Sequence, residues 1–415
     1  MNQDSRVAAG GWLVGASEKI LEKGDITLSY CFQSKEDCEG NADGLYYFSM
    51  PTVPAVRNKR RISYNKKHFD RFKNEIAQIE PDVIHIFGTE TWFQRQFAYM
   101  LRDMGLIDKT IVWIQGLTYH CARDYANSMT FGEIHRITLW EFIRGTNVAG
   151  IRKRLKYNGM GEIEEIGFLK NVFVRTDWDS ACCLALNREL NFYNCNETLR
   201  DAFYVEKLWD IENVEKYSIF TTNYSSPLKG FHQMIEAMAI IVKEFPNAKL
   251  YTTGIDIINK PTGLDKRIRE PSYFKELREK IFEYNLQDNI VFLGTLLEDE
   301  MRDRFITSHV FSSTSSIENS PNTVGEAMIL GVPCVASDVG GVSSLLKHGE
   351  EGLLYPFSEY TMLAEYICRI FRSKELACDL SKRARKRALE THDKEQNYRA
   401  LLSAYSKIYG FSEKN

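Results

Sequence analysis

Two glutamates separated by seven residues lie where a loop runs into a helix, in the segment 315–333. Glu318 lies in the loop that should follow a strand, and Glu326 lies in the first turns of the helix. Ligands of open α/β sheets bind at the carboxyl edge of the strands. The unpaired backbone amides at the helix start, near Asn322 and Thr323, favour an anion such as phosphate. The pattern therefore predicts a phosphate-binding site with a carboxylate on either side.

The elements that would hold these residues alternate regularly in the second half of the chain. Apolar runs of strand length alternate with helical patterns whose apolar residues recur three and four positions apart. Short apolar strands separated by such helices indicate a parallel sheet covered on both faces. We expect a doubly wound α/β domain over residues 216–380, with strands at 217–222, 249–253, 290–293, 310–313, 334–337 and 352–355.

Composition limits the class of protein. The 415 residues include 53 basic and 56 acidic side chains and are 44% hydrophobic, which is typical of a globular chain. Two domains are expected because a single core seldom grows beyond about 250–300 residues. The near-neutral net charge argues against a nucleic-acid partner. Nine scattered cysteines, no long apolar run and no signal-peptide character indicate a reduced, cytoplasmic protein.

The first half repeats the strand pattern more faintly, and we expect an N-terminal Rossmann-like domain over residues 1–208 with a linker near 205–216. A glycine-rich turn containing Gly11 opens a helical pattern, but no strand-like run precedes it, so the first central strand is expected to be missing. The tail 381–412 predicts a long helix that crosses back to the N-terminal domain. The candidate strands of the first half are 26–31, 83–87, 110–115 and 172–175.

The chain resembles the family 4 glycosyltransferases. Their hallmark is Glu-x7-Glu running into Glu-Ala-Met/Leu-Ala-x-Gly-x-Pro-Val, and this sequence has Glu318-x7-Glu326 followed by Ala-Met-Ile-Leu-Gly-Val-Pro-Cys-Val. It also has Gly-Leu-Leu-Tyr-Pro at 352–356. The resemblance implies an α/β fold of the GT-B type, with two Rossmann-like doubly wound parallel-sheet domains facing a cleft.

The resemblance also implies roles for the residues of the C-terminal domain. Glu318 would act in catalysis by holding donor-sugar hydroxyls, and Glu326 would bind the nucleotide ribose. Lys229, in Pro-Leu-Lys-Gly-Phe-His at 227–232, would neutralise the donor diphosphate, and the adjacent Gly230 would also belong to the donor site. Negative charge builds on the leaving phosphate, so the chemistry needs a fixed cation and helix-end amides. The helix start would supply those amides from Asn322 and Thr323, and the strand end would place Leu293 and Gly294 near the base.

Fewer residues of the N-terminal half match the family. His120 is a candidate catalytic residue facing the donor sugar, and a loop histidine without function is the alternative. Arg175, at the end of an expected strand, could meet acceptor or phosphate, and Gly11 could approach the ligand with its backbone. The family usually places an arginine five or six residues before the lysine, where this chain has Asn223 and Tyr224.

A basic run could contact a membrane. Residues 57–73 contain eight lysines and arginines against one aspartate, interleaved with aromatic side chains, and 144–156 add Arg144, Arg152, Lys153, Arg154 and Lys156. Such a run can hold an anionic bilayer, which would suit a lipid-linked acceptor at the inner face of the membrane, and a solvated helix face is the alternative.

The resemblance thus implies a retaining hexosyltransferase. The donor would be a nucleotide-diphosphate sugar and the acceptor a saccharide or lipid-linked hydroxyl, in surface polysaccharide synthesis. No cofactor and no metal would be required. Two alternatives remain open, namely a non-catalytic nucleotide-sugar-binding protein and a GT-B sugar epimerase.

Overall fold

The computed structural model describes residues 19–24, 26–42, 44–51, 64–259, 263 and 268–410. The chain divides into two compact units, each built from segments that are distant in the sequence. Of the described residues, unit 1 comprises 120–156, 199–259, 263 and 268–393, and unit 2 comprises 19–24, 26–42, 44–51, 64–119, 157–198 and 394–410. Among the described residues, no helix is long and apolar enough to cross a bilayer.

Unit 1 is built on a six-stranded parallel sheet with the order β10-β9-β8-β11-β12-β13. Every residue of the last three strands in this order is buried, which shows that helices cover the sheet on both faces. The strands are β8 (Glu215–Thr221), β9 (Lys249–Thr252), β10 (Ile290–Phe292), β11 (Ser308–Ser313), β12 (Cys334–Ser337) and β13 (Gly352–Tyr355). The predicted doubly wound domain is confirmed.

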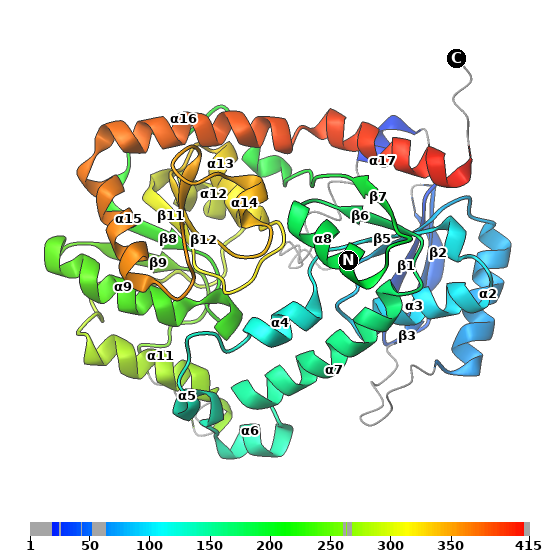
Figure 1. Cartoon of the computed structure of the whole chain (residues 1–415), viewed down its shortest axis with the longest axis horizontal. Coiled ribbons are helices and arrows are strands. Elements are labelled where there is room, and N and C mark those ends of the chain that lie inside the picture. Colours follow the sequence, from blue (N-terminus) through cyan, green and yellow to red (C-terminus); the bar gives the residue numbers. More distant parts are fainter. Residues whose placement is uncertain are drawn as a thin grey trace. The chain divides into compact units, whose positions relative to one another are not determined.

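The helices of unit 1 connect these strands (Figure 1). Helix α9 packs against α11 and α15, whereas α13 packs against α16. They are α9 (Phe231–Glu244), α11 (Ser272–Glu283), α12 (Glu298–Thr307), α13 (Asn322–Ile329), α14 (Val342–Leu345), α15 (Tyr360–Arg372) and α16 (Lys374–Thr391), with short 3-10 turns η2 (Asp201–Phe203) and η3 (Pro227–Lys229).

Residues 120–156 group with unit 1, although they follow a strand of unit 2 in the sequence. They form α4 (Thr118–Asp124), α5 (Phe131–His135), α6 (Leu139–Arg144) and the first half of α7 (Val148–Ile166). The expected linker near 205–216 also belongs to unit 1, because Trp209 is buried in its core and donates a hydrogen bond to the Ser308 carbonyl at 2.8 Å.

Unit 2 contains two separate sheets. One is parallel, with the order β4-β5-β6-β7, and the other has the order β1-β3-β2, in which β2 runs antiparallel. The strands are β1 (Ser29–Ser34), β2 (Glu39–Ala42), β3 (Leu45–Pro51), β4 (Ile84–Phe87), β5 (Thr110–Trp113), β6 (Asn171–Val174) and β7 (Asn191–Asn194). In this second sheet β1 overlaps the predicted strand 26–31, whereas β2 and β3 were not predicted, and β2 has the sequence Glu-Gly-Asn-Ala, without apolar alternation.

The helices of unit 2 are α2 (Lys66–Ile79), α3 (Trp92–Asp103), the turn η1 (Ile107–Lys109), α8 (Asp177–Leu186) and α17 (Lys394–Tyr409). The expected long tail helix is interrupted at His392–Asp393, and α17 lies beside β7 (Figure 1). Its Tyr398 and Leu401 pack against Trp113 and Phe173 of the parallel sheet. The predicted turn at Gly11 and the question of a missing first strand lie outside the described residues.

Candidate active site

The turn that carries Lys229 is fixed to the loop that follows β11. Gly230 ends this turn with φ +63°, and a Cβ atom there would lie 1.8 Å from the Thr314 carbonyl oxygen. Only glycine allows so close an approach of two backbones. The Thr314 hydroxyl donates to the Lys229 carbonyl at 2.8 Å, and the Ser316 amide donates to the Leu228 carbonyl at 2.7 Å. The ends of the adjacent strands β8 and β11 therefore form one rigid edge.

Lys229 and Glu318 form an ion pair at this edge. The ammonium nitrogen lies 2.6 Å from Oε1 of Glu318, and the Ser315 hydroxyl donates to the same oxygen at 2.6 Å. The Glu318 carboxylate raises the pKa of Lys229. Burial alone would lower this pKa, but the attraction to the carboxylate is the larger effect. The Lys229 side chain is still 36% exposed, so this cation is accessible to an anionic ligand.

The backbone of Glu318 is hydrogen-bonded to the turn that follows β12. Its carbonyl accepts a hydrogen bond from the Gly341 amide at 3.0 Å. Gly340 has φ +55°, and a Cβ atom on it would lie 1.9 Å from the same carbonyl oxygen. The chain from 338 to 341 therefore fixes the direction in which Glu318 leaves the loop.

Helix α13 begins at Asn322, four residues after Glu318, at the end of the loop that follows β11. Pro321 occupies the N-cap position, and no side chain caps the first turn. By helix geometry the amides of Asn322 and Thr323 have no carbonyl partner within the helix. Both side chains are half-buried, and the amide oxygen Oδ1 of Asn322 is buried without a hydrogen-bond partner in the structure. The predicted phosphate-binding amides are thus placed at the same sheet edge as Lys229.

Glu326 is buried in α13 and bound by a residue that sequence reasoning did not select. The Arg200 guanidinium donates from Nε to Oε1 of Glu326 at 2.8 Å and lies 3.7 Å from Glu298. The guanidinium carbon of Arg200 also lies 4.7 Å from the centroid of the Phe203 ring.

Leu293 and Gly294 lie at the carboxyl end of β10, at the outer edge of the sheet. Gly294 has φ +72° and is hydrogen-bonded to Gly254 in both directions, at 2.8 and 3.1 Å. A Cβ atom on Gly294 would meet no atom within 4 Å, so this turn faces open space. Tyr224 occupies one of the two positions where the family usually has an arginine. It is buried, and its hydroxyl donates a hydrogen bond to the Ile255 carbonyl.

His120 lies on α4, which ends against the Glu318 loop. The Ser316 hydroxyl donates to the Asp124 carbonyl at 2.9 Å, and Cys121 is close enough to contribute to the raised pKa of Lys229. Burial, assisted by Arg123, lowers the pKa of His120 to about 4. Its imidazole is therefore neutral near pH 7 and can donate one hydrogen bond. A contact with the donor sugar stays a prediction.

Arg175 is enclosed at the carboxyl end of β6 in unit 2. Its side chain is only 2% exposed, it forms an ion pair with buried Glu197, and it donates to the carbonyls of Ile114 and Gln115 at 3.3 and 2.9 Å. A ligand would have to displace these partners before it reached the guanidinium. A ligand contact at Arg175 stays a prediction, as does one at Gly11, which lies outside the described residues.

A cluster of buried carboxyl groups in unit 2 was also missed. Glu162 accepts hydrogen bonds from the Thr89 hydroxyl at 2.7 Å and the Tyr119 amide at 3.2 Å. Burial raises the pKa of Glu90 to about 7 and that of Glu165 well above its usual range. Buried Arg95 is the nearby cation. Sequence patterns do not reveal such desolvation, because the acids come from the loop after β4 and from α7, which are distant in the sequence.

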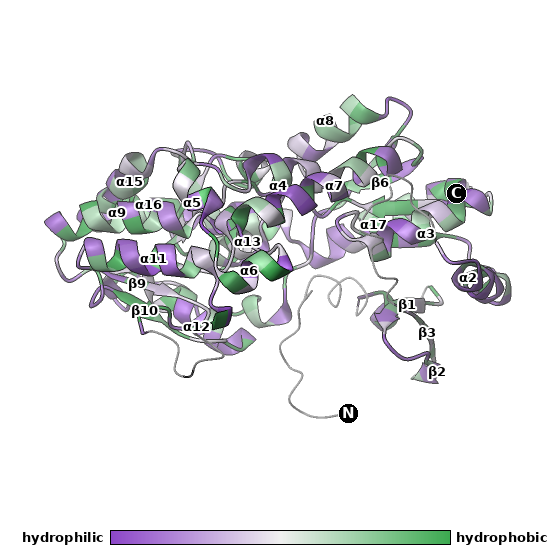
Figure 2. Ribbon diagram, turned by 90° about the horizontal axis from the view of Figure 1, so that it is seen from below, coloured by the Kyte–Doolittle hydropathy of each residue, from purple (hydrophilic) through white to green (hydrophobic). Residues whose placement is uncertain are grey.

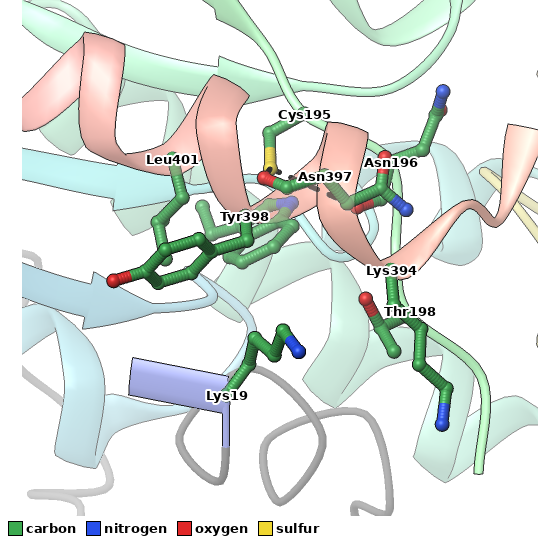
Figure 3. Close-up of a pocket in the computed structure, with 9 residues that line it drawn as sticks. Lys19, Cys195, Asn196, Thr198, Lys394, Asn397, Tyr398 and Leu401 are labelled. Carbon is green, nitrogen blue, oxygen red and sulfur yellow. Dashed lines mark hydrogen bonds between the residues drawn. The ribbon is translucent and has the colours of Figure 1, made fainter. Parts of the chain in front are cut away.

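A small pocket in unit 2 lies between α17 and the end of β7 (Figure 3). The Cys195 thiol donates to the Asn397 carbonyl at 3.5 Å along one wall. The lining residues are Lys19, Trp113, Cys195, Asn196, Thr198, Lys394, Asn397, Tyr398 and Leu401. None of the predicted site residues belongs to this lining, so the pocket is separate from the Lys229–Glu318 pair.

Part of the chain matches a known protein family, and longer stretches are similar to individual proteins. Residues 210–387 match the family described as "Glycosyl transferases group 1". The chain is 26% identical over 210 residues to N-acetyl-alpha-D-glucosaminyl L-malate synthase of Bacillus anthracis, a match that covers 51% of this chain and 49% of that protein. It is 28% identical over 351 residues to YtcC of Bacillus subtilis (strain 168), which carries a provisional glycosyltransferase name, covering 82% and 77%. The chain thus spans about half the length of the first of these relatives.

Solved structures share the fold. Sucrose-phosphate synthase from Thermosynechococcus elongatus matches with a TM-score of 0.68 at 18% identity, covering 94% of this chain and 91% of that one. The Anabaena protein Alr3699/HepE, solved with UDP and glucose, matches with a TM-score of 0.61 at 15% identity, covering 88% and 86%. Residues 210–387 therefore carry the pattern of the group 1 glycosyl transferases, and the chain has the α/β fold of the GT-B glycosyltransferases, with a Rossmann-like parallel sheet in each unit.

Proposed function

We propose that this chain transfers a hexosyl unit from a nucleotide-diphosphate sugar to a hydroxyl acceptor, with retention of the anomeric configuration, as a family 4 enzyme. The observation that carries the proposal is the Lys229–Glu318 pair beside the first amides of α13. It supplies one cation and a set of backbone donors for a pyrophosphate, with a carboxylate next to them for a sugar.

The chemistry follows from where charge develops. When the bond between the anomeric carbon and the diphosphate breaks, negative charge builds on the leaving phosphate. Lys229 remains protonated because its pKa is raised, so it can stabilise that charge throughout the neutral range. In the structure Glu318 satisfies Lys229, so the incoming diphosphate competes for the ammonium and releases the carboxylate to sugar hydroxyls.

The acceptor is a saccharide or a lipid-linked hydroxyl, and surface polysaccharide synthesis is the proposed setting. The support is the similarity to proteins with such names: the chain is 36% identical over 83 residues to TuaC of Bacillus subtilis (strain 168), named for teichuronic acid biosynthesis. The leaving phosphate itself can take the proton of the acceptor hydroxyl. No further group is then needed for the proposed step.

The donor can be found by thermal stabilisation with a panel of nucleotide-diphosphate sugars. UDP-glucose comes first, because Alr3699/HepE was solved with it. A ligand at about 100 times its dissociation constant adds roughly 2.7 kcal/mol to the folded state. The stabilising donor is then incubated with acceptor alcohols, and NMR spectroscopy of the product gives the anomeric configuration.

Each outcome has a definite meaning. Formation of a glycoside with the configuration of the donor supports the proposal, and the inverted product contradicts it. Tight donor binding without turnover across the acceptors would favour the non-catalytic nucleotide-sugar-binding protein. Conversion of the sugar without an acceptor would favour the epimerase.

A further inference from the structure

Helices α5 and α6 turn two charged side chains, Arg136 and Glu141, toward α11. Glu141 of α6 is 3% exposed and accepts hydrogen bonds from the amide and hydroxyl of Ser272 at 2.9 and 3.1 Å. Arg136, which ends α5, donates to Glu276 at 2.7 Å and to Glu279 at 2.5 Å. These contacts fix the two short helices on α11, beside which they lie in Figure 1. The attachment of this segment to unit 1 therefore combines these polar contacts with the packing of Ile134 against the core of the unit.

The opposite side of the same segment is apolar and exposed. Phe131 is 77% exposed, Leu139 73% and Phe142 71%, and Ile143 is also exposed. Leu139, Phe142 and Ile143 are spaced three and four residues apart, so they form one stripe on α6, and α6 is coloured green for hydrophobic in Figure 2. A surface helix of a water-soluble protein normally has the reverse arrangement. We call these four residues the α5–α6 patch.

Two arginines lie at the Trp140 ring of α6, next to the patch. The guanidinium groups of Arg144 and Arg269 lie 4.8 and 5.0 Å from the ring centroid of Trp140, which is half-buried between the exposed residues of α6. The next helix, α7, continues with further exposed basic residues, namely Arg152, Lys153, Arg154 and Lys156. The one acidic side chain of 139–156 is Glu141, which is buried. The exposed charge of this segment is therefore entirely positive.

The basic run at 57–73 differs from this arrangement in its described part. In α2 the aromatic residues face inward, since Phe72 is buried in the core of unit 2 and Phe69 packs against it. Lys66, Lys67 and Lys73 stay exposed, but Arg71 pairs with Asp37. This helix has the ordinary amphipathic pattern, so α2 presents charge without an exposed apolar stripe.

We propose that the α5–α6 patch inserts its apolar side chains into an anionic bilayer surface while the nearby arginines and lysines bind the lipid headgroups. Exposed Phe and Leu beside Trp and basic residues are typical of interfacial helices. The positive charge of the segment favours an anionic bilayer as the partner. Such a bilayer has negatively charged headgroups directly above an apolar interior. The proposal goes beyond sugar transfer and does not depend on it.

Sedimentation with lipid vesicles tests the proposal. The full chain is mixed with vesicles of phosphatidylcholine alone or of phosphatidylcholine with phosphatidylglycerol, and the bound fraction is measured at low and high salt. We expect binding to the anionic vesicles only, weakened by salt. The double variant Leu139→Ser/Phe142→Ser should lower the partition coefficient about 100-fold, because each side chain loses its burial in lipid. Arg144→Gln should lower it about fivefold.

The matched control is Phe282→Ser, which removes an exposed aromatic side chain of α11 in the same unit. It should leave vesicle binding unchanged, and thermal melting should show that all variants are folded. The absence of binding to anionic vesicles would overturn the proposal, as would equal binding of the double variant. If light scattering shows dimers that the double variant converts to monomers, with no vesicle binding, the patch is instead a contact between copies. None of these outcomes depends on sugar transfer.

Discussion

Each of the two parallel sheets has an ion pair at its carboxyl edge, and the two pairs differ in their exposure to solvent. In unit 1 the Lys229–Glu318 pair is partly exposed and next to the uncapped start of α13. In unit 2 the Arg175–Glu197 pair is almost completely buried and further bound by backbone carbonyls. A ligand can exchange with the first pair at little cost, whereas opening the second would leave a buried charge unpaired. The same position in two similar sheets thus suits binding in one unit and stability in the other.

The largest effect is expected from breaking the buried pair. Arg175→Ala should lower the free energy of unfolding by about 3–5 kcal/mol, because Glu197 then remains as an uncompensated buried carboxylate. Chemical denaturation measures the change. The control is Lys170→Ala, which breaks the exposed Lys170–Glu189 pair of the same unit and should cost at most about 1 kcal/mol. Equal effects of the two variants would contradict the contrast between the edges.

Glu318→Gln sharpens the comparison on the other edge. The amide keeps the shape of the side chain but loses its charge, so the sugar is held less accurately and transfer should fall about 100-fold. Binding of UDP alone should stay the same or tighten, since Lys229 is no longer neutralised by its neighbour. Steady-state kinetics and calorimetry give the two quantities. Parallel losses would assign Glu318 to the nucleotide instead.

Arg200→Ala tests the link between Arg200 and the buried Glu326. Loss of a hydrogen bond to a charged, buried partner should lower stability by about 1.5–3 kcal/mol. Arg302→Ala removes a partly exposed arginine of α12 whose partners Asp299 and Asp303 are themselves exposed, and it should change stability by less than about 1 kcal/mol. Chemical denaturation measures both changes. Equal losses of stability in the two variants would show that Glu326 does not depend on Arg200.

The smallest effect concerns pH. Burial raises the pKa of Glu90 to about 7 from an ordinary value of 4.5, so the folded state holds the proton more tightly than the unfolded state. Its contribution to stability is therefore fully present below pH 4.5 and is lost as the pH rises to about 7. Glu90→Gln should flatten this decline, by on the order of 1 kcal/mol. Melting curves across that range measure it, with exposed Glu189→Gln as the control that should leave the slope unchanged.

Much of unit 1 could be predicted because buried parallel strands are continuous apolar runs. The strands β12 and β13 have the predicted bounds, and β8 and β11 differ by one or two residues at their ends. In unit 2 the strand β7, with the sequence Asn-Phe-Tyr-Asn, was missed because it lacks such a run. Local pattern was thus sufficient where the sheet is covered on both faces.

The site was predicted where one segment carries a motif, and missed where contacts join distant segments. Lys229 and Glu318 are 89 residues apart, and each was selected from its own motif. Arg200 meets Glu326 across 126 residues, and nothing near either residue specifies the other. The buried acids Glu90 and Glu165 were missed because burial, not residue type, shifts their pKa values.

The central claim is that the Lys229 ammonium binds the diphosphate of the donor. The most direct measurement is calorimetric titration of UDP into the unaltered chain, Lys229→Ala and the control Lys216→Ala, which removes an exposed lysine at the start of β8. We predict that Lys229→Ala raises the dissociation constant at least tenfold, equivalent to about 1.4 kcal/mol, with an unchanged melting temperature. An unchanged dissociation constant in Lys229→Ala, with UDP still binding, would contradict the claim.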